Sequence, residues 1–144
     1  VDNQGLNISG QDLRNEWVVF DQEYIFILGK KDRPFYSYNQ SWILSFGKVY
    51  ERLDSDADTY TSITTIIDDM THRPLFCDTL SCLRLLMSSY RIAVLSNSDD
   101  RVLYPVVNRL EVKFDEVMSS EEAYCYKLSP KIFHDMLARL QVSS

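Results

Sequence analysis

Apolar side chains recur every three or four positions over most of the first half of the chain, which is the spacing of amphipathic helices. The first such stripe consists of Leu13, Trp17, Phe20, Tyr24 and Ile27. It predicts a helix that begins at Asp12 and is ended by the segment from Gly29 to Pro34. Glycine favours helix C-termini and proline breaks helices, so this segment is a strong stop signal.

Two further helices are predicted in this half of the chain. Their stripes are Trp42, Phe46, Val49 and Leu53 over about 38–53, and Tyr60, Ile63, Ile67 and Met70 over about 59–71. The stretch from Thr61 to Ile67 is rich in β-branched residues, which favours a strand by propensity. Its helical spacing and its helical neighbours favour a helix instead.

After Pro74 the pattern changes to short apolar runs that alternate with helical stripes. The predicted order is a helix at 78–89, a strand at 91–95, a helix at 99–110, a strand at 114–118, a loop at 119–127 and a helix from Pro130. A strand, a helix and a second strand in succession indicate a right-handed β-α-β unit with parallel strands. Parallel sheets are normally buried on both faces, so we expect further strands that these residues do not supply.

The predicted fold class is therefore α/β, with a partial Rossmann-like parallel sheet (β-α-β) preceded by a helical module. The predicted domains are 1–73 for the helical module and 74–144 for the partial α/β core. The chain begins at Val1 rather than at methionine and ends just after a helical pattern. Both ends are therefore expected to be cuts through a longer gene product.

Composition narrows the classes of function. The 144 residues carry a net charge of −6, which argues against nucleic acid and anionic membranes as partners because both attract basic surfaces. No apolar run approaches the roughly 18–20 residues that span a bilayer. The three cysteines lack a CxxC spacing and the two histidines are isolated, so we expect reduced thiols, a cytoplasmic protein and no metal site.

The strongest chemical signal is the run from Arg91 to Asn97, in which a short apolar strand ends in Ser96 and Asn97. Open α/β sheets bind ligands at the carboxyl ends of their strands, and Lys127 follows in a loop that can reach the same edge. A hydroxyl, a backbone amide and an ammonium at one point form a site for an anion. The competing interpretations are a strand-end turn for Ser96 and Asn97 and a solvated surface position for Lys127.

These segments resemble, in order, the motifs of the haloacid dehalogenase superfamily, and most of all its type II 2-haloacid dehalogenase-like branch. The sequence at 91–98, Arg-Ile-Ala-Val-Leu-Ser-Asn-Ser, is similar to the second family motif. The sequence at 126–133, Tyr-Lys-Leu-Ser-Pro-Lys-Ile-Phe, is similar to the third. Residues 16–17 and 22–24 resemble the first helix of the helical cap that this branch inserts into its core. The resemblance extends over almost the whole chain, and it implies that the helical module is this cap.

The resemblance implies a role for each matched residue. Ser96 would bind phosphoryl or carboxylate oxygens of the substrate, helped by the backbone amide of Asn97. Lys127 would stabilise a nucleophilic aspartate and the charge of the transition state. The side chain of Asn97 would line the cap side of the pocket, and Phe133, six positions after the lysine, would also contact the substrate. Trp17 would lie near the part of the pocket that the cap supplies, although it fits the helix core equally well.

Three departures accompany this match. No Asp-x-(Asp/Tyr)-Gly-Thr nucleophile loop occurs in the sequence, and the fourth family motif is absent as well. Val18 stands where haloacid-specific members carry an arginine after the cap tryptophan, and valine binds neither a halide nor a carboxylate. Leu128 replaces the proline that usually follows the lysine.

The first functional hypothesis is a segment of a haloacid dehalogenase-like hydrolase that acts on a small anionic substrate. Catalysis would proceed through an aspartyl intermediate whose nucleophile lies outside these residues. No cofactor is expected, except Mg²⁺ if the parent is a phosphatase. The alternative is a non-catalytic truncated or degenerate paralogue that binds a partner or an anion, with a homodimer formed through the cap helices or an exposed sheet edge. A helical scaffold without any site is a third interpretation.

Overall fold

The computed structural model describes residues 8–28 and 34–142, with the backbone alone described over 24–28. The stop signal predicted at Gly29 lies outside these residues. The chain divides into two compact units, unit 1 over 1–66 and unit 2 over 67–144. This division falls within the third helix, whereas the boundary predicted from the sequence falls just after it.

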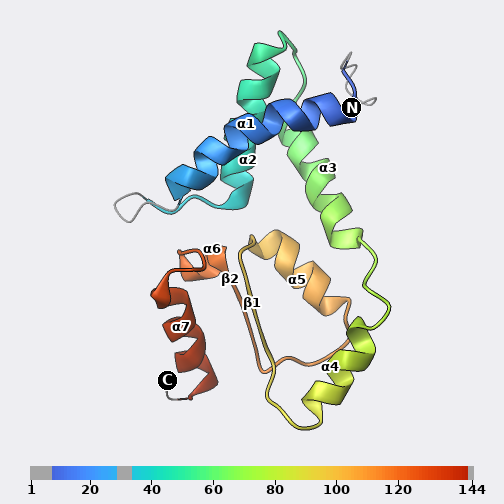
Figure 1. The fold of residues 1–144 in the computed structure, drawn as a ribbon, viewed down its shortest axis with the longest axis vertical. Helices are drawn as coiled ribbons and strands as arrows, with labels where there is room; N and C mark the ends of the chain where they lie inside the picture. The colour runs from blue at the N-terminus through green and yellow to red at the C-terminus, as the bar shows by residue number, and fades with distance from the viewer. Residues whose placement is uncertain (1–7, 29–33, 143–144) are drawn as a thin grey trace. The chain divides into compact units, whose positions relative to one another are not determined.

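Unit 1 consists of helices α1 (Gly10–Leu28), α2 (Tyr38–Arg52) and the first part of α3 (Thr59–His72) (Figure 1). The three predicted helices are confirmed, including α3, where the helical spacing outweighs the β-branched composition. A capping box sets the start of α2: the backbone N–H of Gln40 donates to Ser37 Oγ, and the backbone N–H of Ser37 donates to Gln40 Oε1.

Aromatic side chains of α1 and α2 fill the core of unit 1. The ring of Trp17 stacks on Phe46 with centroids 5.6 Å apart and meets Trp42 edge-on at 6.2 Å. Its indole N–H donates to Ser45 Oγ at 2.9 Å. Phe46 and Val49 are buried, so the apolar stripe predicted for α2 faces this core. Such aromatic pairs stabilise a helix pair beyond the area that they bury.

Two parallel strands form the sheet of unit 2. Strand β1 (Ala93–Ser96) pairs with β2 (Glu116–Ser119) over its full length, so that Ala93 lies opposite Glu116 and Ser96 lies opposite Ser119. The fold class predicted from the sequence, α/β with a parallel β-α-β unit, is confirmed.

Four helices accompany the strands: α4 (Thr79–Met87), α5 (Asp100–Asn108), α6 (Ser120–Ala123) and α7 (Pro130–Leu140). Helix α5 connects β1 to β2, while α6 and α7 follow β2 in the chain. Figure 1 shows α5 on one side of the strand pair and α7 on the other. The arrangement leaves the carboxyl ends of both strands facing the turn into α5 and the start of α6.

Both strands begin two residues later than the sequence predicts. The carboxylate of Asp115 accepts hydrogen bonds from the backbone N–H of Ile92 at 2.8 Å and from Arg91 Nε at 3.1 Å. These bonds lower the pKa of Asp115, with the backbone N–H of Ile92 as the largest cause. Residues 91 and 92 are thus bound by the side chain of Asp115 before the strand ladder begins. The apolar pattern of the sequence does not reveal this contact.

The loop predicted at 119–127 is wrong for residues 120–123, which form α6. Ser119 caps this helix, because its Oγ accepts a hydrogen bond from the backbone N–H of Glu122 at 2.9 Å. Tyr124 ends the helix in the left-handed conformation, with φ of 51°. Ser119 and Glu122 have the spacing of a capping box, so the sequence did contain a signal for this short helix.

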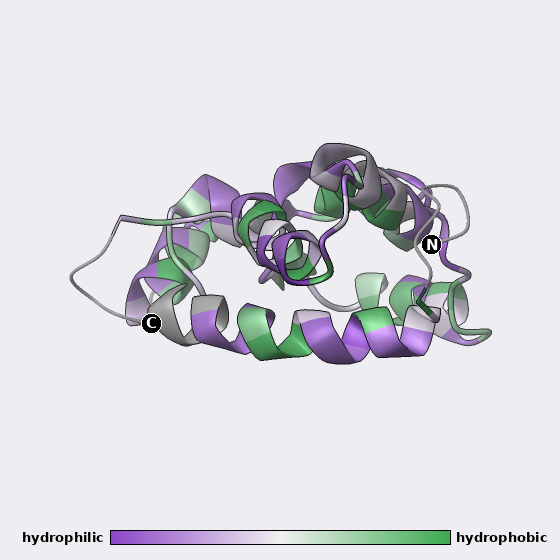
Figure 2. Ribbon diagram, turned by 90° about the horizontal axis from the view of Figure 1, so that it is seen from above, coloured by the Kyte–Doolittle hydropathy of each residue, from purple (hydrophilic) through white to green (hydrophobic). Residues whose placement is uncertain are grey.

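One hydrophobic cluster of unit 2 lies between the strands and α7. Its buried members are Met118, Ala123, Ile132 and Met136, and the partly buried side chains packed against them are Ala93, Leu95, Cys125 and Leu140. Burial raises the pKa of the Cys125 thiol. Figure 2 shows hydrophobic and hydrophilic residues alternating along the helices, as amphipathic helices require.

Helix α4 differs from the other helices of unit 2 because none of its residues is buried. Leu85 in the helix is 73% exposed, and Phe76 just before it is 85% exposed. Leu80, Leu83 and Met87 on the other side of this helix are half-buried.

Candidate functional site

Both strands of unit 2 end in a serine at the same edge of the sheet. Ser96 and Ser119 are partners in the ladder; Ser119 is fully buried, whereas Ser96 is half-buried. The chain continues from β1 through Asn97 toward α5, and from β2 through Ser120 into α6. The carboxyl edge of a parallel sheet is where open α/β folds bind ligands.

Lys127 reaches this edge from the loop between α6 and α7. Its Nζ donates to the carbonyl oxygen of Leu95 at 2.8 Å. Its backbone N–H donates to Asn97 Oδ1 at 2.7 Å, and Asn97 Nδ2 donates to the carbonyl oxygen of Lys127 at 3.2 Å. The structure thus brings Lys127 beside Ser96 and Asn97, although 30 residues separate Asn97 from Lys127 in the chain.

A second group of hydrogen bonds holds the loop that follows β1. The hydroxyl of Ser119 donates to the carboxylate of Asp100, and the backbone N–H of Asp100 donates to Glu121 Oε2 at 2.8 Å. The hydroxyl of Ser120 donates to the carbonyl oxygen of Ser98 at 3.0 Å. These bonds hold the loop after Asn97 against the start of α6 at the edge of the sheet.

Sequence reasoning did not select Ser119 and Ser120 as members of this edge. A signal was present, because residues 118–120 repeat the order of an apolar residue, a serine and a polar residue found at 95–97. The two segments occupy equivalent positions in the sheet, because Ser96 and Ser119 are partners in the ladder and each is the last residue of its strand.

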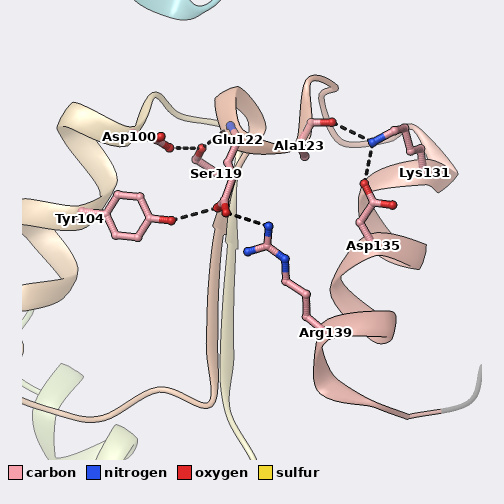
Figure 3. Close-up of polar contacts among 8 residues, drawn as sticks. All are labelled: Asp100, Tyr104, Ser119, Glu122, Ala123, Lys131, Asp135 and Arg139. Atoms are coloured by element: carbon pink, nitrogen blue, oxygen red, sulfur yellow. Dashed lines mark hydrogen bonds and ion pairs between the residues drawn. The ribbon is translucent and has the colours of Figure 1, made fainter.

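Glu122 connects three elements beside the site. Tyr104 in α5 donates its hydroxyl to Glu122 Oε2 at 2.9 Å, and Arg139 in α7 donates to Glu122 Oε1 at 2.7 Å (Figure 3). The Arg139 guanidinium lowers the pKa of Glu122. Burial, and next the Glu122 carboxylate, raise the pKa of Tyr104 to about 12. Glu122 is thus ionised and Tyr104 neutral at physiological pH, which suits the hydrogen bond between them.

Lys131 secures the loop that carries Lys127. Its ammonium donates to the carbonyl oxygen of Ala123 at 2.9 Å and to Asp135 Oδ2 at 2.6 Å (Figure 3). The hydrogen bond to Asp135 raises the pKa of Lys131. Since Ala123 ends α6 and Lys131 lies in the first turn of α7, this bond closes the loop between the two helices.

The two aromatic site candidates lie in different units. Trp17 belongs to unit 1, where its ring and its indole N–H contact residues of α2. Phe133 lies on α7 in unit 2, with 41% of its surface exposed. Their predicted contacts with a substrate stay predictions.

No group of three or more histidine, cysteine or acidic side chains is placed to hold a metal ion in the part of the chain that the structure describes. None of the described helices combines the length and the apolar character needed to cross a membrane.

Comparison with solved structures identifies the fold. The defluorinating L-2-haloacid dehalogenase Rha0230 matches with a TM-score of 0.76 and 15% identity, covering 99% of this chain and 59% of that one. The L-2-haloacid dehalogenase PA0810 matches with a TM-score of 0.75 and 16% identity, covering 94% and 59%. A dehalogenase solved with an intermediate complex has a TM-score of 0.71 and 19% identity, covering 99% and 63%.

The chain therefore has the mixed α/β fold of the haloacid dehalogenases, as the motif order at 91–98 and 126–133 predicts. It spans about three fifths of the length of these proteins. No family model matches the sequence, and a search of curated proteins found no match.

Proposed function

We propose that this chain is the segment of a haloacid dehalogenase-like hydrolase that holds a small anionic substrate at the edge formed by Ser96 and Lys127. The nucleophilic aspartate would come from outside these 144 residues and form the covalent aspartyl intermediate. The proposal places the protein in the cytoplasm and requires no cofactor; a phosphatase parent would add Mg²⁺.

The placement of the Lys127 ammonium carries this proposal. It donates to the carbonyl oxygen of Leu95, the residue directly before Ser96, at the carboxyl end of a parallel strand. A fixed positive charge next to a hydroxyl complements an anion and a transition state that gains negative charge. The fold shared with the haloacid dehalogenases supports the same assignment.

Each residue has a defined part in the proposal. Ser96 donates its hydroxyl to a substrate oxygen, and Lys127 neutralises the negative charges of the substrate and of the nucleophile. Phe133 would contact the substrate from α7, and a substrate contact of Trp17 stays a prediction. Asn97 borders the site through its bonds to Lys127.

The first test is anion binding by the 144-residue chain. Inorganic phosphate and 2-chloropropionate are titrated separately against ¹⁵N-labelled protein, and the backbone amide shifts of Ser96 and Asn97 are followed. Replacing Lys127→Ala should weaken binding at least about tenfold, because a charge-assisted hydrogen bond contributes roughly 1.5–3 kcal/mol. The probe that binds more tightly indicates a phosphoryl or a carboxylate substrate.

Lys48→Ala is the matched control, because Lys48 is an exposed lysine of unit 1 that pairs with Glu51. Equal affinities for Lys127→Ala and Lys48→Ala would contradict the proposed site. So would haloacid turnover by the native protein that survives the loss of Lys127.

The alternative proposal is a non-catalytic domain that binds an anion or a protein partner, including a second copy of the chain. It is favoured by Val18 and Leu128, which depart from the dehalogenase pattern, and by the exposed apolar side chains around α4. The intact mass of the protein from its source separates the two proposals. A mass well above 16.8 kDa favours a complete hydrolase, and a mass near that value favours the binding domain.

A further inference from the structure

The geometry points to Asn97 as the residue that positions Lys127. This inference rests on the proposed function, in which Lys127 supplies the positive charge of the site. It assigns to Asn97 an action through the lysine, and it explains how a loop residue becomes fixed at the end of a strand.

Asn97 binds both polar groups of one peptide residue. Its Oδ1 accepts from the backbone N–H of Lys127 at 2.7 Å, and its Nδ2 donates to the carbonyl oxygen of the same residue at 3.2 Å. A primary amide offers an acceptor and a donor in one plane, so this one side chain serves both the N–H and the carbonyl group of Lys127, which lies in a turn. The pair of bonds therefore fixes the position and the orientation of the lysine backbone together.

The lysine is held at its other end as well. Its Nζ donates to the carbonyl oxygen of Leu95, so the backbone is attached at residue 97 and the ammonium at residue 95. The two attachment points flank Ser96 in the sequence, so the lysine is bound on both sides of that serine. If the bonds to Asn97 were lost, the lysine would keep only the attachment of its ammonium to Leu95, and the charge would no longer be preorganised.

Other contacts of the loop do not substitute for this pair of bonds. The bond from Lys131 to the carbonyl oxygen of Ala123 closes the loop between α6 and α7, and the backbone N–H of Ser129 donates to the carbonyl oxygen of Tyr126 at 2.9 Å. Both bonds act within the segment that follows β2. The bonds of Asn97 tie that segment to the end of β1, across which the proposed anion would bind.

The chemistry of the amide predicts a graded series of variants. Asn97→Ala removes both bonds to Lys127. Asn97→Asp keeps the shape and the acceptor for the backbone N–H, but it loses the donor and places a carboxylate against the carbonyl oxygen of Lys127. At the N–H group of Lys127, Asn97→Ala should therefore cause a larger disturbance than Asn97→Asp. At the carbonyl group of Lys127, both variants should cause a disturbance.

The experiment measures amide hydrogen exchange of the 144-residue chain by NMR, together with its affinity for inorganic phosphate. In Asn97→Ala, the exchange rate of the Lys127 amide should rise about tenfold, while the amides of α7 keep their rates. The affinity for phosphate should fall by a similar factor. Asn97→Asp should keep most of the protection of the Lys127 amide and lose affinity, because its added negative charge repels the anion.

Ser98→Ala is the matched control, since Ser98 lies in the same loop and its hydroxyl is buried without a hydrogen-bond partner in the structure. Exchange at Lys127 that is equal in Asn97→Ala and Ser98→Ala would overturn the positioning role, as would a rise in exchange over all of unit 2. If the unmodified chain fails to bind phosphate and 2-chloropropionate, the proposed function fails, and the exchange data alone still decide whether Asn97 holds Lys127.

Discussion

The core of unit 1 and the strand edge of unit 2 are held by different kinds of interaction. In unit 1 the ring of Trp17 packs against the rings of Phe46 and Trp42, and Trp17 adds a hydrogen bond to Ser45. At the edge of unit 2, Asn97 and Lys127 are joined by hydrogen bonds between 2.7 and 3.2 Å.

The difference follows from what each region has to do. Apolar packing is strong and non-directional, so it holds helices together but does not aim a polar atom. Hydrogen bonds contribute less free energy each, but they fix distance and angle. A core that tolerates small shifts and an edge that does not should therefore respond differently to mutation, and three predictions test this contrast.

The largest effect is expected in the aromatic core. Phe46→Ala should destabilise unit 1 by about 3–5 kcal/mol, because it removes a buried ring that stacks on Trp17 and leaves a cavity. Urea unfolding followed by tryptophan fluorescence measures this, since both tryptophans of the chain lie in unit 1. Leu44→Ala in the same helix is the control and should change stability by no more than about 0.5 kcal/mol, because Leu44 is exposed.

A smaller and pH-dependent effect is expected at Glu122. Glu122→Gln weakens the bonds from Arg139 and Tyr104 and should cost about 1–2 kcal/mol at pH 7. The pKa of Glu122 is lowered in the folded state, so its contribution is present above its ordinary pKa of 4.5 and is lost as the pH falls through the lowered value. The two proteins should therefore converge in stability in acid.

Circular dichroism during urea unfolding at several pH values measures this difference, with Glu51→Gln as the control. Glu51 pairs with Lys48 at the surface, and such pairs contribute little. A difference between Glu122→Gln and the parent that grows as the pH falls would contradict the assigned role of Glu122.

The smallest effect is expected at Asp21, where the substitution should increase stability instead of lowering it. Asp21 in unit 1 is buried with 8% of its surface exposed, and one of its carboxylate oxygens has no hydrogen-bond partner in the structure. Burial raises the pKa of Asp21, so its charged form is unfavourable in the folded state. Asp21→Asn should therefore stabilise unit 1 by about 1 kcal/mol at pH 7.

The contribution of Asp21 to stability changes with pH in the opposite direction to that of Glu122. Because the pKa of Asp21 is higher in the folded state than in the unfolded one, the parent protein loses stability as the pH rises above the unfolded value. The advantage of Asp21→Asn should accordingly vanish on acidification, as measured by thermal unfolding at pH 4 and pH 7. Glu23→Gln, at an exposed position of the same helix, is the control.

Much of the fold was predictable because the spacing of apolar residues along the chain indicates helices and strands. The stripes of α1, α2 and α3 have a helical period, and the run that ends at Ser96 is too short and too apolar for a surface helix. The start of β1 was misplaced because the bonds of Asp115 to residues 91 and 92 join segments that are distant in the chain.

The sequence by itself determined the class of the fold and the identity of the polar residues at the strand ends, because periodicity and residue type are local properties. Only the tertiary structure decided which of these residues meet. The parallel register sets Ser119 opposite Ser96, and the loop after α6 brings Lys127 to Asn97. Hydrogen bonds between such distant segments depend on packing, since the bonded atoms approach within about 3 Å only after the strands, α6 and α7 have assembled.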